Sequence, residues 1–409
     1  MLQPASVLSQ ASAGRLANLC RSISLTLAAS LAFLVPFDAV RNIDLQGLLL
    51  IVSGAFAWSA LLFDHREMLK SYDRLSQVLL GVFLICCLIS FLINPHLGYD
   101  FFGAPYIRLG LAGFLACIGI GLLARTVPRR QLLIGLYVLI VGMAIVALPY
   151  SWFRFHSPLR IGGVFAQADI FAGFVGCGLV FGLETLKSYP KHRQALAACQ
   201  VFLAVMLLLT QTRAVLLLVI VIWLLWMFQH RSAQSLRRAG IYAAAILLLF
   251  ATLHYVVPSR LTDTGYASRS ISYRLTLQKY ALGASWQKPL LGYGPGNLAD
   301  PLSCERLIAK SLQRTCNEGY FFNSSHNIFI DRVLAVGWLG GLAFLGLVVL
   351  AIYRGFRYKN KYGVLGYALV LISCYYLTNV TSAGLELLLW ILLLQCLPAP
   401  VELVSRGGA

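Results

Sequence analysis

The sequence predicts an all-α polytopic membrane protein with about twelve transmembrane helices and one long loop that contains short helices. Of its 409 residues, 59% are hydrophobic and only 12% are charged, which is more apolar surface than a soluble domain can bury. Apolar runs recur along the whole chain, and Lys and Arg gather in alternate loops between them. The excess of 33 basic over 15 acidic residues therefore reflects membrane topology and does not indicate a nucleic-acid partner.

A helix needs about 20 apolar residues to cross roughly 30 Å of hydrocarbon. Runs of about this length predict twelve spans at residues 23–40, 45–63, 76–94, 107–124, 131–149, 168–186, 195–211, 213–229, 239–256, 331–353, 363–380 and 384–399. The first lacks a small-residue cleavage site and is read as a span, not as a signal peptide. We expect helices 1–9 in residues 1–257, a loop domain in 258–330 and helices 10–12 in 331–409.

The short loops fix the orientation of these spans. Those after the even-numbered spans are basic, with Arg66, Lys70, Arg74, Arg125, Arg129, Arg130, Lys187, Lys191, Arg193, Arg231, Arg237, Arg238, Arg354, Arg357, Lys359 and Lys361. Residues 94–106 contain no Lys or Arg. By the positive-inside rule both termini are cytoplasmic and the long loop faces outward. That loop is itself basic, which indicates an anionic partner on the outer side.

The cysteines agree with this topology. Eight of the ten lie in or beside spans, where thiols behave as small hydrophobic groups. Cys304 and Cys316 lie in the outer loop, where a disulfide would contribute about 3 kcal/mol in an oxidising compartment. Two unpaired thiols are the alternative. A bond here would clamp a short helix that Asp300 caps and Pro301 begins.

Two arginines are candidates for binding an anion. Arg213 follows a very short outer turn at the start of a span, where it either snorkels to the headgroups or binds a lipid phosphate together with helix amides. Residues 270–286 are typical of an amphipathic helix that carries Arg274. This helix either lies on the membrane or clamps an anion. Arg269, just before this helix, and Lys279 within it are lesser candidates.

His326 is the strongest candidate for a catalytic residue. It lies just before the tenth span, where a helix N-terminus and nearby arginines favour a neutral imidazole that can accept a proton. A general base for a sugar hydroxyl needs this property. The glycine run at 292–297 lacks the strand and the Lys-Ser/Thr of nucleotide-binding loops, so it predicts a tight turn. The sequence contains no metal-binding or cofactor motif, and we expect a reaction that needs neither.

The order of these features resembles the O-antigen ligase family of bacterial inner-membrane glycosyltransferases. The residues that carry the resemblance are Thr212-Arg213, Arg274, Pro289, the glycines Gly292, Gly294 and Gly296, His326-Asn327, and the motif with Arg160, Gly162, Gly163, Phe165, Gln167 and Asp169. The family more often has Asn at the position of Asp169. Each motif is short, so the resemblance rests on their order and on the topology.

The resemblance implies a membrane-embedded fold of the GT-C kind. It implies a donor of undecaprenyl diphosphate carrying a glycan, and an acceptor hydroxyl on lipid A–core oligosaccharide. By the same resemblance, His326 would be the general base on the periplasmic face, and Arg213 and Arg274 would bind the diphosphate. Further substrate-binding residues would be Arg160, Gln167, Arg269, Gly294 and Asn327. Single displacement would invert the anomeric configuration.

Other functions remain open. An O-antigen polymerase or a protein O-oligosaccharyltransferase would use the same donor with a different acceptor. Protein-glycosylating relatives commonly carry a further region after the last span, whereas this sequence ends at Ala409, which favours the ligase. A transporter of lipid-linked sugar would need polar residues along a central path, and Asp169 and Glu386 are too few to indicate one.

Overall fold

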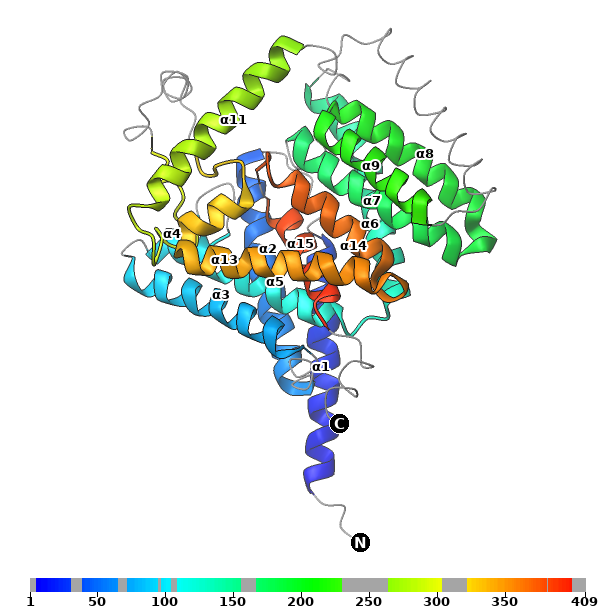
Figure 1. Ribbon diagram of the computed structural model, residues 1–409. Helices are drawn as coiled ribbons and strands as arrows, with labels where there is room; N and C mark the ends of the chain where they lie inside the picture. Colours follow the sequence, from blue (N-terminus) through cyan, green and yellow to red (C-terminus); the bar gives the residue numbers. More distant parts are fainter. Residues whose placement is uncertain are drawn as a thin grey trace. The chain divides into compact units, whose positions relative to one another are not determined.

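The computed structural model describes residues 5–30, 39–64, 72–94, 97–103, 109–155, 167–229, 264–303, 322–380 and 382–398. Within these ranges every regular element is a helix (Figure 1), as the sequence predicts. The chain divides into two compact units. The first comprises Met1–Arg129, Tyr273–Gly366 and Tyr376–Ala409, and the second Arg130–Ser272 and Tyr367–Tyr375.

The first unit is built around an aromatic cluster. Its helices are α1 (Ala5–Ser30), α2 (Ala39–Asp64), α3 (Arg74–Ile93), α4 (Leu97–Phe102), α5 (Leu111–Ala124), α13 (Ile328–Arg357) and α15 (Ala383–Cys396), with most of α11 (Thr264–Ser285) and the start of α14 (Lys359–Tyr375). One ring from each of α3, α5, α13 and α15 meets in the core, namely Phe83, Phe114, Phe344 and Trp390. All four are fully buried, and such contacts add to the energy of burial.

The second unit is organised around α7 (Ala168–Ser188). Around it lie α6 (Arg129–Phe155), the 3-10 turn η3 (Pro190–His192), α8 (Arg193–Thr210) and α9 (Arg213–Gln229) (Figure 1). Three glycines of α7 let these neighbours approach. A Cβ on them would lie 2.8 Å from Val215 of α9 at Gly176, 2.7 Å from Ile140 of α6 at Gly178, and 1.1 Å from Gln200 of α8 at Gly182. Small residues at helix contacts are typical of membrane-embedded bundles.

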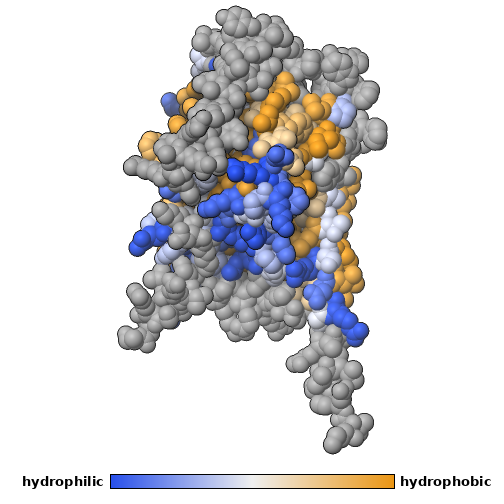
Figure 2. All heavy atoms as spheres, turned by 90° about the vertical axis from the view of Figure 1, so that its right-hand side faces the viewer, coloured by the Kyte–Doolittle hydropathy of each residue, from blue (hydrophilic) through white to orange (hydrophobic). Residues whose placement is uncertain are grey.

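Most of the predicted spans correspond to helices. Six helices are long and apolar enough to cross a membrane, at Leu45–Leu62, Arg74–Ile93, Arg129–Pro149, Ala168–Ser188, Pro190–Thr210 and Ile328–Arg357. Four shorter apolar helices, at Leu111–Ala124, Arg213–Gln229, Tyr362–Tyr375 and Ala383–Cys396, match four further runs. Exposed leucines and isoleucines on α9 suit contact with lipid, and Figure 2 shows apolar surface beside a group of hydrophilic side chains.

Two of the predicted spans do not have this support. The first run, 23–40, overlaps α1, which begins at Ala5 and is described as far as Ser30. Residues 5–22 are rich in Ala and Leu and extend the helix, although their polar residues make it less apolar than a typical span. The run at 239–256 lies outside the described residues. The count of twelve stays a prediction.

The helix α13 is broken in its first half. Gly337 adopts a left-handed φ of 78°, which interrupts the backbone ladder. The glycine-rich segment that follows α11 completes the freed groups through Tyr293 N–H to Leu334 O (2.8 Å), Gly294 N–H to Ala335 O (3.0 Å) and Trp338 N–H to Pro289 O (2.8 Å). Irregular backbone inside a membrane protein persists only where protein satisfies it in this way.

The glycine run itself forms the tight turn that its sequence predicts. Gly292 has φ 67° and Gly294 has φ 112°, backbone conformations that residues other than glycine rarely adopt. A Cβ on Gly292 would meet the backbone of Ala335 at 2.5 Å. Glycine is therefore required here both for the turn and for the close approach to α13.

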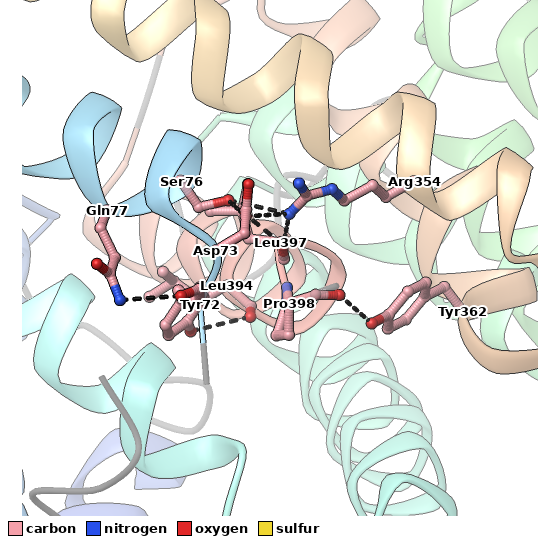
Figure 3. Close-up of polar contacts among 9 residues, drawn as sticks. All are labelled: Tyr72, Asp73, Ser76, Gln77, Arg354, Tyr362, Leu394, Leu397 and Pro398. Atoms are coloured by element: carbon pink, nitrogen blue, oxygen red, sulfur yellow. Dashed lines mark hydrogen bonds and ion pairs between the residues drawn. The ribbon is translucent and has the colours of Figure 1, made fainter. Parts of the chain in front are cut away.

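A polar cluster, shown in Figure 3, lies at the C-terminal end of α13, away from the glycine turn. Arg354 near the end of α13 donates to Asp73 Oδ1 (2.8 Å), to Ser76 Oγ (3.0 Å) and to the carbonyl of Leu397. Tyr72 donates to Leu394 O (3.1 Å), and Tyr362 donates to Pro398 O. These groups satisfy carbonyls at the C-terminal end of α15 that have no partner within the helix.

Two residues of this cluster lie just before the α3 span and have shifted pKa values. Burial alone would raise the pKa of Asp73, but hydrogen bonds from Arg354 and Ser76 hold it below its ordinary value. Burial raises the pKa of Tyr72 to about 12, against the opposing effect of Arg125, whose guanidinium lies 4.6 Å from the ring centre. Asp73 is therefore an anion facing a buried cation, and Tyr72 remains a donor.

We expect Arg354→Met to lower the free energy of unfolding by about 3 kcal/mol, because it leaves Asp73 and the Leu397 carbonyl without their buried partner. The specific activity of the molecules that stay folded should not change. Thermal unfolding in detergent measures the effect. Arg357→Met, at an exposed site on the same helix, is the control and should have little effect. Equal losses in both variants would contradict a role for the cluster in stability.

Candidate functional site

His326 lies in a short segment whose backbone is held from several sides. Its φ of 61° is left-handed, one of two such values among the described residues other than glycine. Asn327 follows as the N-cap of α13, with its side-chain oxygen accepting from the amides of Phe329 (3.0 Å) and Ile330 (3.3 Å). The His326 side chain is partly exposed at the start of this helix. The prediction that it precedes a helix N-terminus is confirmed.

Asp331 lies in the first turn of α13, and only 3% of its surface is exposed. Its Oδ2 accepts from the Ser324 hydroxyl and its Oδ1 from the Ser325 amide, each at 2.7 Å. The Ser324 Oγ also accepts from the His326 amide at 3.1 Å. Asp331 was not among the residues predicted from the sequence, although a carboxylate at the start of an apolar span is a signal of function.

A glutamine of α11 joins Arg274 to this segment. Gln278 donates from Nε2 to the His326 carbonyl (3.3 Å) and to the Leu377 carbonyl (3.0 Å). Arg274 precedes Gln278 by one helical turn on the same face of α11, about 6 Å along the helix. The structure therefore places Arg274 one helical turn from the residue that contacts the His326 carbonyl. Gln278 was not predicted.

The helix α11 confirms the helical pattern at 270–286 and begins six residues earlier, at Thr264. Arg269 is exposed and lies on a different side of α11 from Arg274, because five residues correspond to about 140° beyond a full turn. Ring contact of Tyr273 with Phe322, at 6.1 Å between centroids, also fixes α11 beside the chain that leads to His326.

Arg213 occupies the second unit, at the first position of α9. The turn before it consists of Gln211, in left-handed backbone with φ 54°, and Thr212, so the very short connection is confirmed. The Thr212 hydroxyl donates to Asp169 Oδ1 at 3.0 Å, which joins this turn to the start of α7. Gln167, exposed at the N-cap of α7, is thereby near the same end of the bundle as Arg213.

The predicted residues thus fall into two groups. His326, Asn327, Arg274 and Gly294 belong to the first compact unit, and Arg213, Gln167 and Arg269 to the second. The candidates Arg160, Cys304 and Cys316 lie outside the described residues, as does most of the short helix expected from Pro301, of which residues 301–302 form a turn. The substrate roles of all these residues stay predictions.

A buried ion pair lies one residue beyond Asp331. Arg332 of α13 bonds Glu386 of α15, and Trp390 donates to the same carboxylate at 3.0 Å. The guanidinium also lies over the rings of Phe114 (4.3 Å) and Phe344 (5.3 Å). Glu386, considered above for a transport pathway, is fully buried and holds α15 to α13.

In chemical terms, the first unit carries an imidazole at His326 and a guanidinium at Arg274, on two segments that Gln278 joins. The imidazole can take a proton, and the guanidinium can hold an anion through paired N–H donors. The side chains of Gln278, Asp331 and Asn327 hold the backbone around His326 through hydrogen bonds. This arrangement suits transfer from a donor with an anionic leaving group to a hydroxyl acceptor.

Comparison with known proteins supports such chemistry. Residues 198–345 match the family described as O-Antigen ligase, with the designation Wzy_C. The segment contains Arg213, Arg274 and His326. A ComP-specific O-oligosaccharyltransferase from Acinetobacter baylyi is 29% identical over 165 residues, which cover 38% of this chain and 26% of that protein. The chain thus matches about a quarter of the length of this curated relative.

Proposed function

We propose that this multi-pass membrane protein, similar to the O-antigen ligase family through residues 198–345, transfers a glycan from undecaprenyl diphosphate to a sugar hydroxyl of lipid A–core oligosaccharide. The observation that carries the proposal is the joining of the His326 segment to the Arg274 helix through Gln278. The family match indicates an enzyme of the glycosyltransferase type. The donor, the acceptor and the mechanism are our proposal.

In this mechanism the His326 imidazole accepts the proton of the acceptor hydroxyl as its oxygen attacks the anomeric carbon. The bond from that carbon to the diphosphate oxygen breaks, and its electron pair leaves with undecaprenyl diphosphate. Arg274 and Arg213 neutralise the charge that develops on the leaving diphosphate. One displacement inverts the anomeric configuration, and the imidazolium then releases its proton to water.

The two ends of α13 support a periplasmic site. His326 precedes the N-terminus of this helix, and Arg354 lies near its C-terminus, on the far side of the break at Gly337. Arg354 in the last turn of α13 and Arg125 at the C-cap of α5 border the short basic connections of the sequence and meet the same Tyr72–Asp73 corner. Because such loops remain in the cytoplasm, we place His326 on the periplasmic face of the inner membrane and both termini in the cytoplasm.

The remaining binding residues are proposed with different roles. Gln167 and Arg269 are exposed and available to a glycan, and Arg160 is proposed from the motif that it shares with Gln167. Gly294 and Asn327 act through the backbone, because the first permits the packed turn and the second caps α13. No cofactor is part of the proposal.

A protein acceptor is the second candidate. The relative from Acinetobacter baylyi is named an O-oligosaccharyltransferase specific for ComP, so transfer to a protein hydroxyl by this chain has a specific observation in its favour. The donor half of the reaction would be unchanged, because the leaving group is the same diphosphate. Only the acceptor distinguishes the two functions.

A reconstituted transfer assay tests the proposal. Purified protein in liposomes with EDTA receives undecaprenyl-diphosphate glycan and, in separate reactions, lipid A–core, a protein acceptor or no acceptor. We expect glycan on lipid A–core alone, without added metal, and a raised donor KM for Arg274→Ala with partial recovery in Arg274→Lys. Transfer to protein alone would establish the second candidate. Lengthening of the glycan without acceptor would identify a polymerase, and no turnover in any reaction would refute glycosyl transfer.

A further inference from the structure

We propose that Asp331 is a positioning residue that fixes the catalytic geometry of His326 through the Ser324 hydroxyl. The inference rests on the proposed role of His326 as general base and adds a residue to that site. Asp331 does not touch the substrate in this proposal. It acts on the backbone that carries the imidazole.

The hydrogen bonds form a continuous path from Asp331 to His326. The carboxylate takes the Ser324 hydroxyl on one oxygen and the Ser325 amide on the other, both at 2.7 Å. Ser324 in turn accepts the His326 amide at 3.1 Å. Ser324 and Ser325 are 3% and 0% exposed. Two consecutive residues before His326 are therefore tied to one buried side chain.

This path opposes the backbone strain at His326. A left-handed φ of 61° is unfavourable for a residue with a Cβ and persists only where the surroundings enforce it. The bonds from Asp331 hold the two preceding residues, the Asn327 cap holds the following turn, and Gln278 holds the His326 carbonyl. Of these, the Asp331 bonds alone reach the amide side of His326 among the contacts described.

A carboxylate suits this position better than an amide does. Ser324 O–H and Ser325 N–H both donate, so the residue at 331 must supply two acceptors. Both bonds are short, at 2.7 Å, so both acceptor oxygens are in use. Asparagine would supply one acceptor oxygen. Its NH₂ group would face the Ser324 hydroxyl, which would then have to accept a hydrogen bond instead of donating one.

The adjacent ion pair offers a matched control. Arg332–Glu386 is also buried on the first half of α13, but its partners are α15 and aromatic rings of the core. Glu386→Gln weakens a buried carboxylate contact of the same helix without touching residues 324–326. This control therefore distinguishes general damage to α13 from a specific effect on His326.

Kinetics of glycan transfer test the inference with Asp331→Ala, Asp331→Asn, Ser324→Ala and Glu386→Gln. Misplacing a catalytic group by about 1 Å costs on the order of 100-fold in rate. We expect kcat to fall about 100-fold in Asp331→Ala and about tenfold in Asp331→Asn and Ser324→Ala. Donor KM should stay within about twofold, and Glu386→Gln should keep its kcat while losing thermal stability. A rise in donor KM with unchanged kcat would overturn the inference.

The same substitutions in a His326→Ala background decide between positioning and structure. If Asp331 acts through the imidazole, Asp331→Ala lowers the residual rate no further, because the group that it positions is absent. A multiplicative loss would show a structural role and overturn the inference. Should Asp331→Ala fail to fold, Asp331→Asn and Ser324→Ala give the same comparison. Full activity of His326→Ala would instead refute the base itself, and hence the proposed mechanism.

Discussion

Replacement of His326 by Ala should lower kcat for glycan transfer by about a thousandfold, within the range that general-base catalysis contributes. The acceptor hydroxyl is a weak nucleophile until its proton is removed. Donor binding should be little affected, because in the proposed mechanism the arginines, and not His326, bind the diphosphate. The measurement is the initial rate at saturating donor, from protein that elutes as one species.

The left-handed backbone at this position calls for a second variant. Asn tolerates positive φ better than most residues, so His326→Asn keeps the segment in place while removing the base. We expect His326→Asn to be as inactive as His326→Ala. Recovery of activity in the Asn variant would show that the residue serves the backbone conformation and not proton transfer.

Replacement of Gly294 by Ala should strongly destabilise the protein. The added Cβ would lie 1.7 Å from Asp100 Oδ1, a fully buried side chain, and the backbone φ of 112° is unfavourable for Ala. We expect destabilisation of about 4 kcal/mol or more, seen as low yield and a lowered unfolding temperature in detergent.

Gly283 provides the matched control for this substitution. It lies inside α11, and a Cβ added there would have nothing within 4 Å beyond its own helix. Gly283→Ala should therefore stabilise the protein by about 0.5–1 kcal/mol through helix propensity. If Gly294→Ala is as stable as Gly283→Ala, the packing of the glycine turn against α4 is wrong.

Composition predicted the helices well where apolar runs are bounded by charges or by Gly and Asn. The run at 76–94 corresponds to α3 within two residues at its start, and the run at 213–229 to α9. The start of α1 was missed because a polar but helix-forming stretch carries no hydropathy signal. The break at Gly337 was also missed, since one glycine in an apolar run gives no local sign of it.

The residues of the candidate site also fall into those that the sequence predicted and those that it did not. His326 and Arg274 were predicted because each is a polar residue in an unusual place, the first before a predicted span and the second on a helix expected in the basic outer loop. Gln278 is an ordinary helix residue whose role depends on a carbonyl 48 positions away, and no local pattern contains that information. Asp331 did carry a signal, as an acid at the start of a predicted span, but a single carboxylate there is less conspicuous than the histidine that precedes it.

The broken helix α13 has a consequence for the order in which this protein is assembled. A single span normally satisfies its own backbone while the chain is being inserted, but α13 is completed by Pro289, Tyr293 and Gly294. These residues are synthesised before α13, so its partners already exist when Gly337 leaves the ribosome. The helix therefore completes its backbone hydrogen bonds only when residues 289–294 pack against it, and a chain in which this packing fails leaves unsatisfied backbone groups within α13.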